Sequence, residues 1–144
     1  MSDALVWQLV KKHSAFLHKQ KGIELTKEPG NLTGRNCFRF SGLAHAHALD
    51  VSLGKDGAVY FSKKRHTAGR HPAKTWAKYK LTQHQRNGTN KAAHAIKSQS
   101  SGQFPVAYRG DLAKLAVAKY HKLFRARVNA AKQAKADAKK ESKQ

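Results

Sequence analysis

The residues best suited to chemistry in this chain are lysines and arginines that stand without acidic neighbours. From Gly57 to Gly110 the sequence holds eleven Lys and Arg and no Asp or Glu. Each cation that meets a nucleic-acid phosphate releases condensed counterions, so a set of such contacts gives tight, salt-sensitive binding. The same stretch contains Trp76 and Tyr79, whose rings could stack on unpaired bases. The pattern therefore indicates an RNA-binding surface.

We expect the RNA contacts to come from basic and aromatic side chains of this stretch and the histidines beside them: Lys63, Lys64, Arg65, His66, Arg70, His71, Lys74, Trp76, Lys78, Tyr79, Lys80 and Arg86. Two simpler interpretations stay open. Trp76 and Tyr79 could complete the core at the base of a loop, because Trp is usually largely buried. The cations could form a solvated face, although such faces normally carry interleaved carboxylates.

The charge of the whole chain supports a polyanionic partner. With 29 Lys and Arg against 8 Asp and Glu, the formal net charge is +21 over 144 residues. A surplus of this size repels itself in a compact fold unless a polyanion shares the load. Nucleic acid and an anionic membrane surface are the two candidates. The chain has neither leucine heptads nor a helix-turn-helix pattern, so RNA is favoured over DNA.

Other function classes find little support in the residues. Cys37 is the single cysteine, so no disulfide framework or paired-cysteine metal site is expected. Nine histidines could suggest a metal, with His45 and His47 or His66 and His71 as pairs, but carboxylate or cysteine partners are missing beside them. No catalytic triad, phosphate loop or paired carboxylates occur, so we expect no enzyme, cofactor or small-molecule substrate. Secretory-signal and membrane-spanning patterns are also missing, and we expect a soluble intracellular protein.

The elements that must carry these side chains can be placed from periodicity and turn residues. Ser2 or Asp3 caps a short helix through Val10, and Lys21-Gly22 joins two short strands at 16–20 and 23–26. Glu28 to Asn31 forms a turn, and Cys37 to Phe40, with aromatics at alternate positions, predicts a strand. Alternation around Gly54 to Gly57 predicts a hairpin with Leu49, Val51, Leu53, Val59 and Phe61 on its buried face.

The second half predicts a basic loop and two helices. Residues 64–85 show no helical period and should form an extended loop, continued by a strand from Trp76 to Leu81. A brief helix should run from Asn87 or Thr89 to Lys97 and end in the serines beyond it. Asp111 begins the longest helix, whose core arc holds Leu112, Ala116, Tyr120, Leu123 and Phe124, although Leu115 and Lys119 blur the pattern.

These elements predict an α+β fold, with a small, mainly antiparallel sheet, packed helices and a basic C-terminal helical extension. We assign residues 1–128 to one RNA-binding domain. Residues 129–144, rich in Ala and Lys, form a tail without an apolar face.

Several segments resemble a known family. Residues 28–43, EPGNLTGRNCFRFSGL, are similar to the EPxNL and RNxFRYxGL signature of the eukaryotic large-subunit ribosomal protein numbered 28. Leu5 to Val10, the hairpin ending in Lys63-Lys64-Arg65, and Arg109 to Leu112 also resemble that family. Phe40 stands where the family commonly has Tyr, and the Ala-Lys tail departs from the family's usual basic end.

The resemblance implies a structural component of the cytosolic 60S subunit, assembled in the nucleolus, that binds large-subunit rRNA and neighbouring 60S proteins. It adds Arg35, Asn36 and Arg39 to the expected RNA contacts. It implies neither catalysis nor a metal. A nuclear ribosome-assembly factor with a similar N-terminal domain is the alternative. That factor typically carries more cysteines and a long acidic C-terminal region, and neither is found here.

Overall fold

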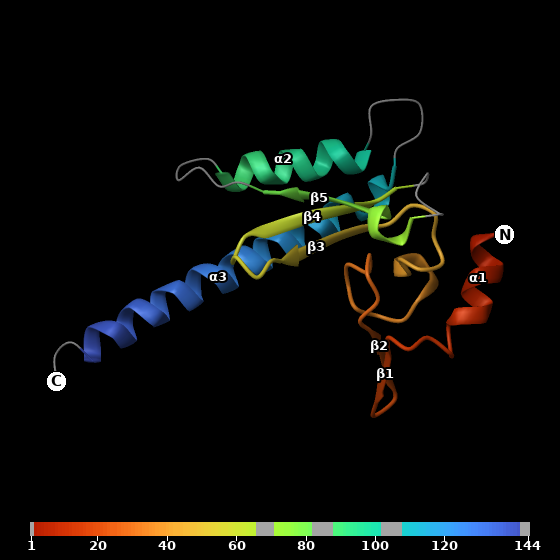
Figure 1. The fold of residues 1–144 in the computed structure, drawn as a ribbon, viewed down its shortest axis with the longest axis horizontal. Helices are drawn as coiled ribbons and strands as arrows, with labels where there is room; N and C mark the ends of the chain where they lie inside the picture. The colour runs from red at the N-terminus through yellow and green to blue at the C-terminus, as the bar shows by residue number, and fades with distance from the viewer. Residues whose placement is uncertain (1, 66–70, 82–87, 102–107, 142–144) are drawn as a thin grey trace.

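The computed structural model of the chain describes residues 2–65, 71–81, 88–101 and 108–141, with 88–90 and 137–141 described by their backbone alone. In chain order its elements are α1 Asp3–Val10, β1 Leu17–Gln20, β2 Ile23–Thr26, the 3-10 turn η1 Phe38–Phe40, β3 Leu49–Leu53, β4 Val59–Lys64, η3 Pro72–Lys74, β5 Trp76–Lys80, α2 Gly88–Ser101, η4 Gly110–Leu112 and α3 Ala113–Glu141. The predicted α+β class is confirmed (Figure 1).

The main sheet is antiparallel and has the order β3-β4-β5. The predicted hairpin forms its centre, with Val51 opposite Phe61 and Leu53 opposite Val59. Gly57 supplies the positive φ of +69° that the connecting turn requires. The other predicted core residues on this hairpin face inward as expected. Leu53 is the exception, because it lies at the end of the sheet and 48% of its surface is exposed.

Helices cover one face of this sheet (Figure 1). Ile96 of α2 and Tyr120 of α3 are fully buried beside Phe61, and Leu112 and Ala116 complete the same core. Because α3 packs on β3 and α2 packs on α3, the apolar arc predicted for the last helix is confirmed, with its far end only half-buried. In Figure 1, α3 runs on well beyond the sheet.

The N-terminal segments also form as predicted. The Ser2 hydroxyl accepts a hydrogen bond from the Leu5 amide at 3.4 Å, which caps α1. The predicted strands pair as β1 and β2, a separate two-stranded sheet. Lys21 and Gly22 at its turn have φ of 45° and 80°, the left-handed geometry of a tight hairpin turn. These elements lie beyond one end of the main sheet (Figure 1).

The strand predicted at Cys37 to Phe40 is wrong. Phe40 and Ser41 instead donate backbone hydrogen bonds to the carbonyls of Cys37 and Phe38, which closes a 3-10 turn. In this turn the Phe38 ring lies against Trp7 and His45, with centroid separations of 6.0 and 4.6 Å, while Phe40 packs against the core. Aromatic residues at alternate positions can therefore occur in a turn as well as in a strand.

The serines expected to end α2 lie inside it. The Ser98 hydroxyl donates to the carbonyl of Ala95 at 3.0 Å, and that of Ser101 donates to the carbonyl of Lys97 at 2.6 Å. Bonds of this kind let serine remain helical, because its hydroxyl finds an acceptor within the preceding turn. The alternative cap Asn87 lies outside the described residues, and Thr89 lies within the helix.

The predicted basic loop is described in part. Residues 66–70 and 82–87 are outside the described ranges, and between them the chain forms η3 and the predicted strand, β5. The C-terminal tail is helical as far as Glu141, as part of α3. This helix passes through residue 128 without a break, and the division of the chain at that point stays a prediction.

Trp76 lies over the turn at Gly30, which has a φ of +82°. A methyl group added to Gly30 would come within 2.3 Å of the Trp76 ring and 3.1 Å of the Ala48 side chain. Trp76 is half-buried, and its ring packs on the Gly30 turn, which joins this turn to the sheet. The interpretation of Trp76 as a packing residue is therefore supported.

We expect Gly30→Ala to destabilise the fold more than Gly22→Ala. Both glycines have positive φ, where an Ala costs roughly 1 kcal/mol or more. A methyl group at Gly22 meets nothing within 4 Å, whereas at Gly30 it meets Trp76. Overpacking of this kind adds about 1–3 kcal/mol, to be measured as the difference in unfolding free energy by urea titration. Equal losses in the two variants would show that the contact with Trp76 is loose.

Candidate nucleic-acid interface

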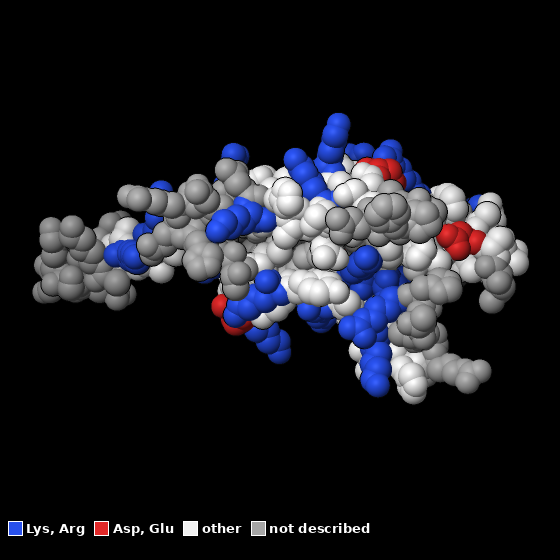
Figure 2. Space-filling model, turned by 90° about the horizontal axis from the view of Figure 1, so that it is seen from above, with Lys and Arg blue, Asp and Glu red and all other residues white. Residues whose placement is uncertain are grey.

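The fold itself engages the carboxylates of this chain. Of the eight acidic residues, all but Asp137 and Glu141 have described side chains. Each described carboxylate has a polar partner within the protein. The ion pairs among described side chains join Asp3 to His45, Glu24 to Lys19, Asp50 to Lys119, Asp56 to Lys80, and Asp111 to Arg39 and Arg109. Most of the other described Lys and Arg side chains are exposed, and Figure 2 shows Lys and Arg spread over one face, with isolated acidic groups.

Arg65, His71 and Lys74 gather where β4 meets η3. The Arg65 amide donates to the carbonyl of Thr75 at 2.8 Å, which extends the ladder between β4 and β5 by one residue. The amide of Lys74 donates to the carbonyl of His71 at 2.9 Å, so η3 holds both residues beside this ladder. All three side chains are exposed. The predicted basic surface therefore has a rigid base here.

Successive residues of β5 alternate between the two faces of the sheet. Tyr79 lies opposite Phe61 on the helix-covered side, where the two rings stack at 6.4 Å and Tyr79 is still 47% exposed. Lys78 and Lys80 consequently point to the other face, and both are exposed. Lys80 pairs with Asp56 at 3.1 Å, and this hydrogen bond raises the pKa of its ammonium.

Lys64 turns into the protein. Its ammonium donates to the carbonyls of Gly42 and His45 at 2.8 and 2.7 Å, and to that of Leu43 at 3.5 Å. Burial lowers the pKa of this ammonium from its usual value. These bonds tie the 42–45 loop to β4. The geometry therefore assigns Lys64 a structural role, which argues against the RNA contact predicted for it.

Lys63 lies on the opposite side of β4, with its ammonium 4.2 Å from the centre of the Tyr108 ring. The Tyr108 hydroxyl in turn donates to the carbonyl of Lys64. This cation–π contact holds Lys63 near the surface, where it is half-buried. The remaining predicted contacts of this stretch, His66, Arg70 and Arg86, lie outside the described residues.

The segment that carries the family signature is built around two buried side chains, Glu28 and Asn31. The Glu28 carboxylate accepts hydrogen bonds from the Asn31 amide at 3.1 Å, from the Ser41 hydroxyl at 3.3 Å and from the Gly42 amide at 3.2 Å. The Asn31 side chain also accepts from the Gly34 amide at 2.8 Å and donates to the carbonyl of Arg35 at 2.9 Å. This network shapes the whole segment.

The network presents Arg35 to solvent, whereas Asn36 turns inward. The Asn36 amide donates to the carbonyl of Lys11 at 2.9 Å and to the Glu24 carboxylate at 3.0 Å. These bonds give Asn36 a structural role, and its RNA contact stays a prediction. Arg39 is exposed but lies 3.7 Å from the carboxylate of Asp111.

Arg109 joins the start of the last helix to the signature segment. Its guanidinium donates to the carbonyls of His47 and Arg39 at 3.1 and 2.8 Å and binds the carboxylate of Asp111 twice, at 3.0 and 3.2 Å. The bonds from Arg109 lower the pKa of the Asp111 carboxyl. The family-like motif at 109–112 is thus a junction between two parts of the fold.

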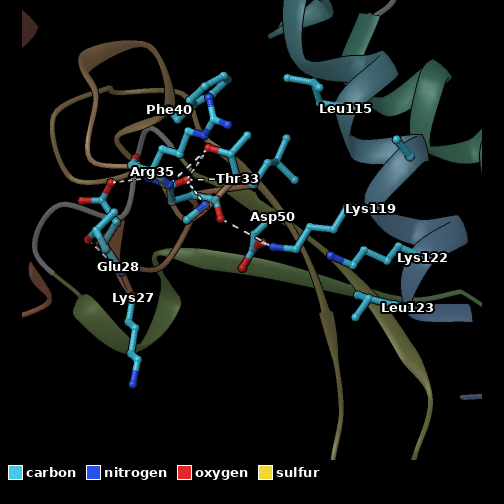
Figure 3. A pocket seen from close by; sticks show the side chains of 15 residues that line it. Lys27, Glu28, Thr33, Arg35, Phe40, Asp50, Leu115, Lys119, Lys122 and Leu123 are labelled. Carbon is cyan, nitrogen blue, oxygen red and sulfur yellow. Dashed lines mark hydrogen bonds and ion pairs between the residues drawn. The ribbon is translucent and has the colours of Figure 1, made fainter. Parts of the chain in front are cut away.

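A groove of about 900 Å³ separates the signature segment from α3 (Figure 3). Phe40, Leu115 and Leu123 give it apolar walls, and its basic lining is Lys27, Arg35, Lys119 and Lys122. Arg35 is the one predicted contact among its lining residues. Lys27, Lys119 and Lys122 were not among the predicted contacts. Lys119 and Lys122 share a groove with the signature segment only because of how α3 docks on the sheet.

Neither a metal-ligand cluster nor a membrane-spanning helix is found in the described part of the chain. No three His, Cys, Asp or Glu side chains there are grouped so that they could hold a metal ion. The two ring nitrogens of His45 are engaged by the Asp3 carboxylate and the Phe38 carbonyl, at 3.0 and 2.8 Å. Among the described helices, none is both long and apolar enough to cross a membrane.

Comparisons with known proteins agree with the signature. The model of the Ribosomal L28e protein family matches residues 5–126. The chain is 34% identical to large ribosomal subunit protein eL28 of Dictyostelium discoideum over 140 residues, which is 97% of this chain and 99% of the relative. It is 30% identical to the Schizosaccharomyces pombe protein of the same name over 83% of this chain and 87% of the relative. A shorter match, 48% over 65 residues, links it to the Caenorhabditis elegans protein of that name, covering 44% of this chain and 52% of the relative.

We expect Glu28→Ala to destabilise the protein by about 3 kcal/mol or more, because it leaves three donors without their acceptor and each unsatisfied buried group costs about 1–3 kcal/mol. Glu24→Ala is the matched control, since Glu24 is exposed and such contacts are worth less than about 1 kcal/mol. Urea unfolding of both variants measures the difference. If Glu28→Ala were as stable as the control, the network would not hold the segment.

Proposed function

This chain belongs to the ribosomal L28e protein family, and on that premise we propose that it is a structural constituent of the large subunit of the cytosolic ribosome. In this role it binds large-subunit rRNA and stabilises the folded RNA around it, and it contacts neighbouring ribosomal proteins. The names of the relatives support the assignment to the ribosome and to its large subunit. The observation that carries the RNA contact is the engagement of the described carboxylates within the fold, which leaves the surplus of basic charge for an external polyanion.

The mechanism is phosphate neutralisation by side chains on a rigid base. Arg65 and Lys74 lie beside a hydrogen-bonded ladder, and Lys78 lies on β5. Their backbone is already ordered, so little conformational entropy is lost when they bind RNA. Each phosphate contact releases counterions, and the sum of these events sets both affinity and its dependence on salt. The chain needs no catalytic group for this task.

Tyr79 adds a different kind of contact. Its ring is about half exposed, so an unpaired base can stack on it, while Lys78 and Lys80 point to the other face of the sheet. Folded RNA offers such bases in loops and bulges, whereas a regular duplex does not. This arrangement favours structured rRNA over simple duplex as the partner.

Contacts with neighbouring proteins are best supported at the N-terminal end. Leu5 and Leu9 of α1 are 50% and 61% exposed, and Ile23 of β2 is 62% exposed. Exposed apolar side chains of this kind are suited to contacts with other proteins. We place the interface with neighbouring subunit proteins here and the RNA interface on the basic surfaces.

RNA binding is tested by its salt dependence. We expect the variant Arg65→Ala, Lys74→Ala, Lys78→Ala to weaken binding of a large-subunit rRNA fragment. The slope of log K against log salt should become shallower by about 1 for each phosphate that is no longer neutralised. Lys64 is left unchanged, because its ammonium holds the fold. Filter-binding titrations over a range of KCl concentrations provide the measurement.

The control removes the same charge elsewhere. Lys12, Lys55 and Lys91 are exposed and lie outside the proposed interface, so Lys12→Ala, Lys55→Ala, Lys91→Ala should alter the slope much less. If both triple variants lowered the slope equally, binding would depend on net charge alone and the assigned surface would be wrong.

Residence in the mature particle has its own test. We expect a tagged form of the full chain to sediment with translating polysomes after passing through nucleolar precursors. A constituent remains with the subunit during translation, whereas an assembly factor leaves before it. Sucrose-gradient sedimentation of cytoplasmic and nuclear extracts separates the two, and confinement to nuclear precursors would favour the assembly factor.

A further inference from the structure

We infer that the groove between the signature segment and α3 binds an unpaired nucleotide of the rRNA, with the base inside and the phosphates on the rim. The inference rests on the proposed function, since it names a particular RNA element for one site of the same protein. The groove lies apart from the basic stretch at 63–80, because none of those residues lines it.

The apolar walls of the groove are incompletely covered by the protein. Leu115 is 36% exposed, and Phe40 and Leu123 are half-buried at the margin of the core. Leu115 and Lys119 fall outside the core arc of the last helix, and both line this groove (Figure 3). The apolar residue of α3 that lies outside the core arc, Leu115, is therefore part of an open apolar surface in the groove.

The charges around these walls suit a phosphate backbone. Arg35 lies beside Phe40, and Lys122 extends from α3 toward the loop, while Lys27 stands at the outer rim (Figure 3). The two carboxylates in the lining are already occupied. Glu28 is hydrogen-bonded within the signature network, and Asp50 is paired with Lys119 at 2.7 Å. The available charge at the groove is therefore positive.

An unpaired nucleotide matches this combination better than other occupants. Its base is a flat, largely apolar group that can pack against Phe40 and the two leucines, and its phosphates carry the negative charge that the rim attracts. A regular duplex keeps its bases stacked and cannot insert one between walls. The volume of about 900 Å³ lies within the range of roughly 300–1,000 Å³ of pockets that bury compact ligands.

The test compares single-stranded with duplex RNA on the full chain. Fluorescence anisotropy with a labelled oligouridine and with a blunt RNA duplex gives the two dissociation constants. We expect Leu115→Gln and Phe40→Leu each to weaken oligouridine binding, with duplex binding unchanged. For Phe40→Leu the loss should be about fivefold or more, the lower end of the effect of removing one base-stacking ring. Arg35→Ala should weaken both.

Leu9→Gln is the matched control, because Leu9 is an exposed leucine on a helix away from the groove. It should leave both dissociation constants unchanged. Thermal melting of each variant verifies that the fold is retained, and Phe40→Leu keeps an apolar side chain in the core. A second measurement is ultraviolet cross-linking of intact subunits, in which Phe40 should link to an rRNA nucleotide.

Unchanged oligouridine binding by the Leu115→Gln and Phe40→Leu variants would overturn the inference, as would cross-links from groove residues to a neighbouring protein instead of RNA. Either result would leave the proposed function intact if the wild-type chain still bound rRNA with a steep salt slope. Failure of the wild-type chain to bind rRNA at all would instead defeat the proposed function.

Discussion

The constraint on which this structure depends is the scarcity of negative charge. A chain with a formal charge of +21 has few carboxylates with which to hold itself together, and each described one contacts a polar partner in the fold. Glu28 organises the signature segment, Asp111 anchors Arg109, and Asp50 binds Lys119 of α3 to the sheet. Under the proposed function, folding and RNA binding use largely different charges. The carboxylates fix the scaffold, and the uncompensated cations remain at its surface.

The motifs that identify the family are mainly devices of folding. Asn31 and Asn36 satisfy backbone groups, Lys64 binds three carbonyls, and Arg109 joins distant segments. A residue type that suits RNA can equally well serve the interior, because backbone carbonyls and phosphates both accept hydrogen bonds from cations. Contact residues are therefore better sought among side chains that the motif presents, such as Arg35, than among the residues that hold the motif in shape.

Local patterns predicted most of the elements, and tertiary contacts decided the rest. Alternation and turn glycines were sufficient for the β3–β4 hairpin, and the 3.6-residue period was sufficient for α3, because both signals arise within a few residues. The turn at Phe38–Phe40 could not be distinguished from a strand, since Phe38 packs against Trp7 and His45 while Phe40 packs against the core, and local spacing indicates neither contact. The inward course of Lys64 and the groove beside Leu115 also depend on how separate segments pack.

Helix α3 is long enough to extend well past the core of the molecule. At 1.5 Å per residue its 29 residues span about 43 Å, whereas roughly 30 Å already equals the width of a small domain. The exposed residues 129–136 extend this helix past the core, which holds it at Tyr120 and its neighbours. Inserting one residue into this exposed segment would rotate the lysines that follow by about 100° around the helix axis. The directions in which these lysines point are thus set by how the helix packs at Tyr120 and its neighbours.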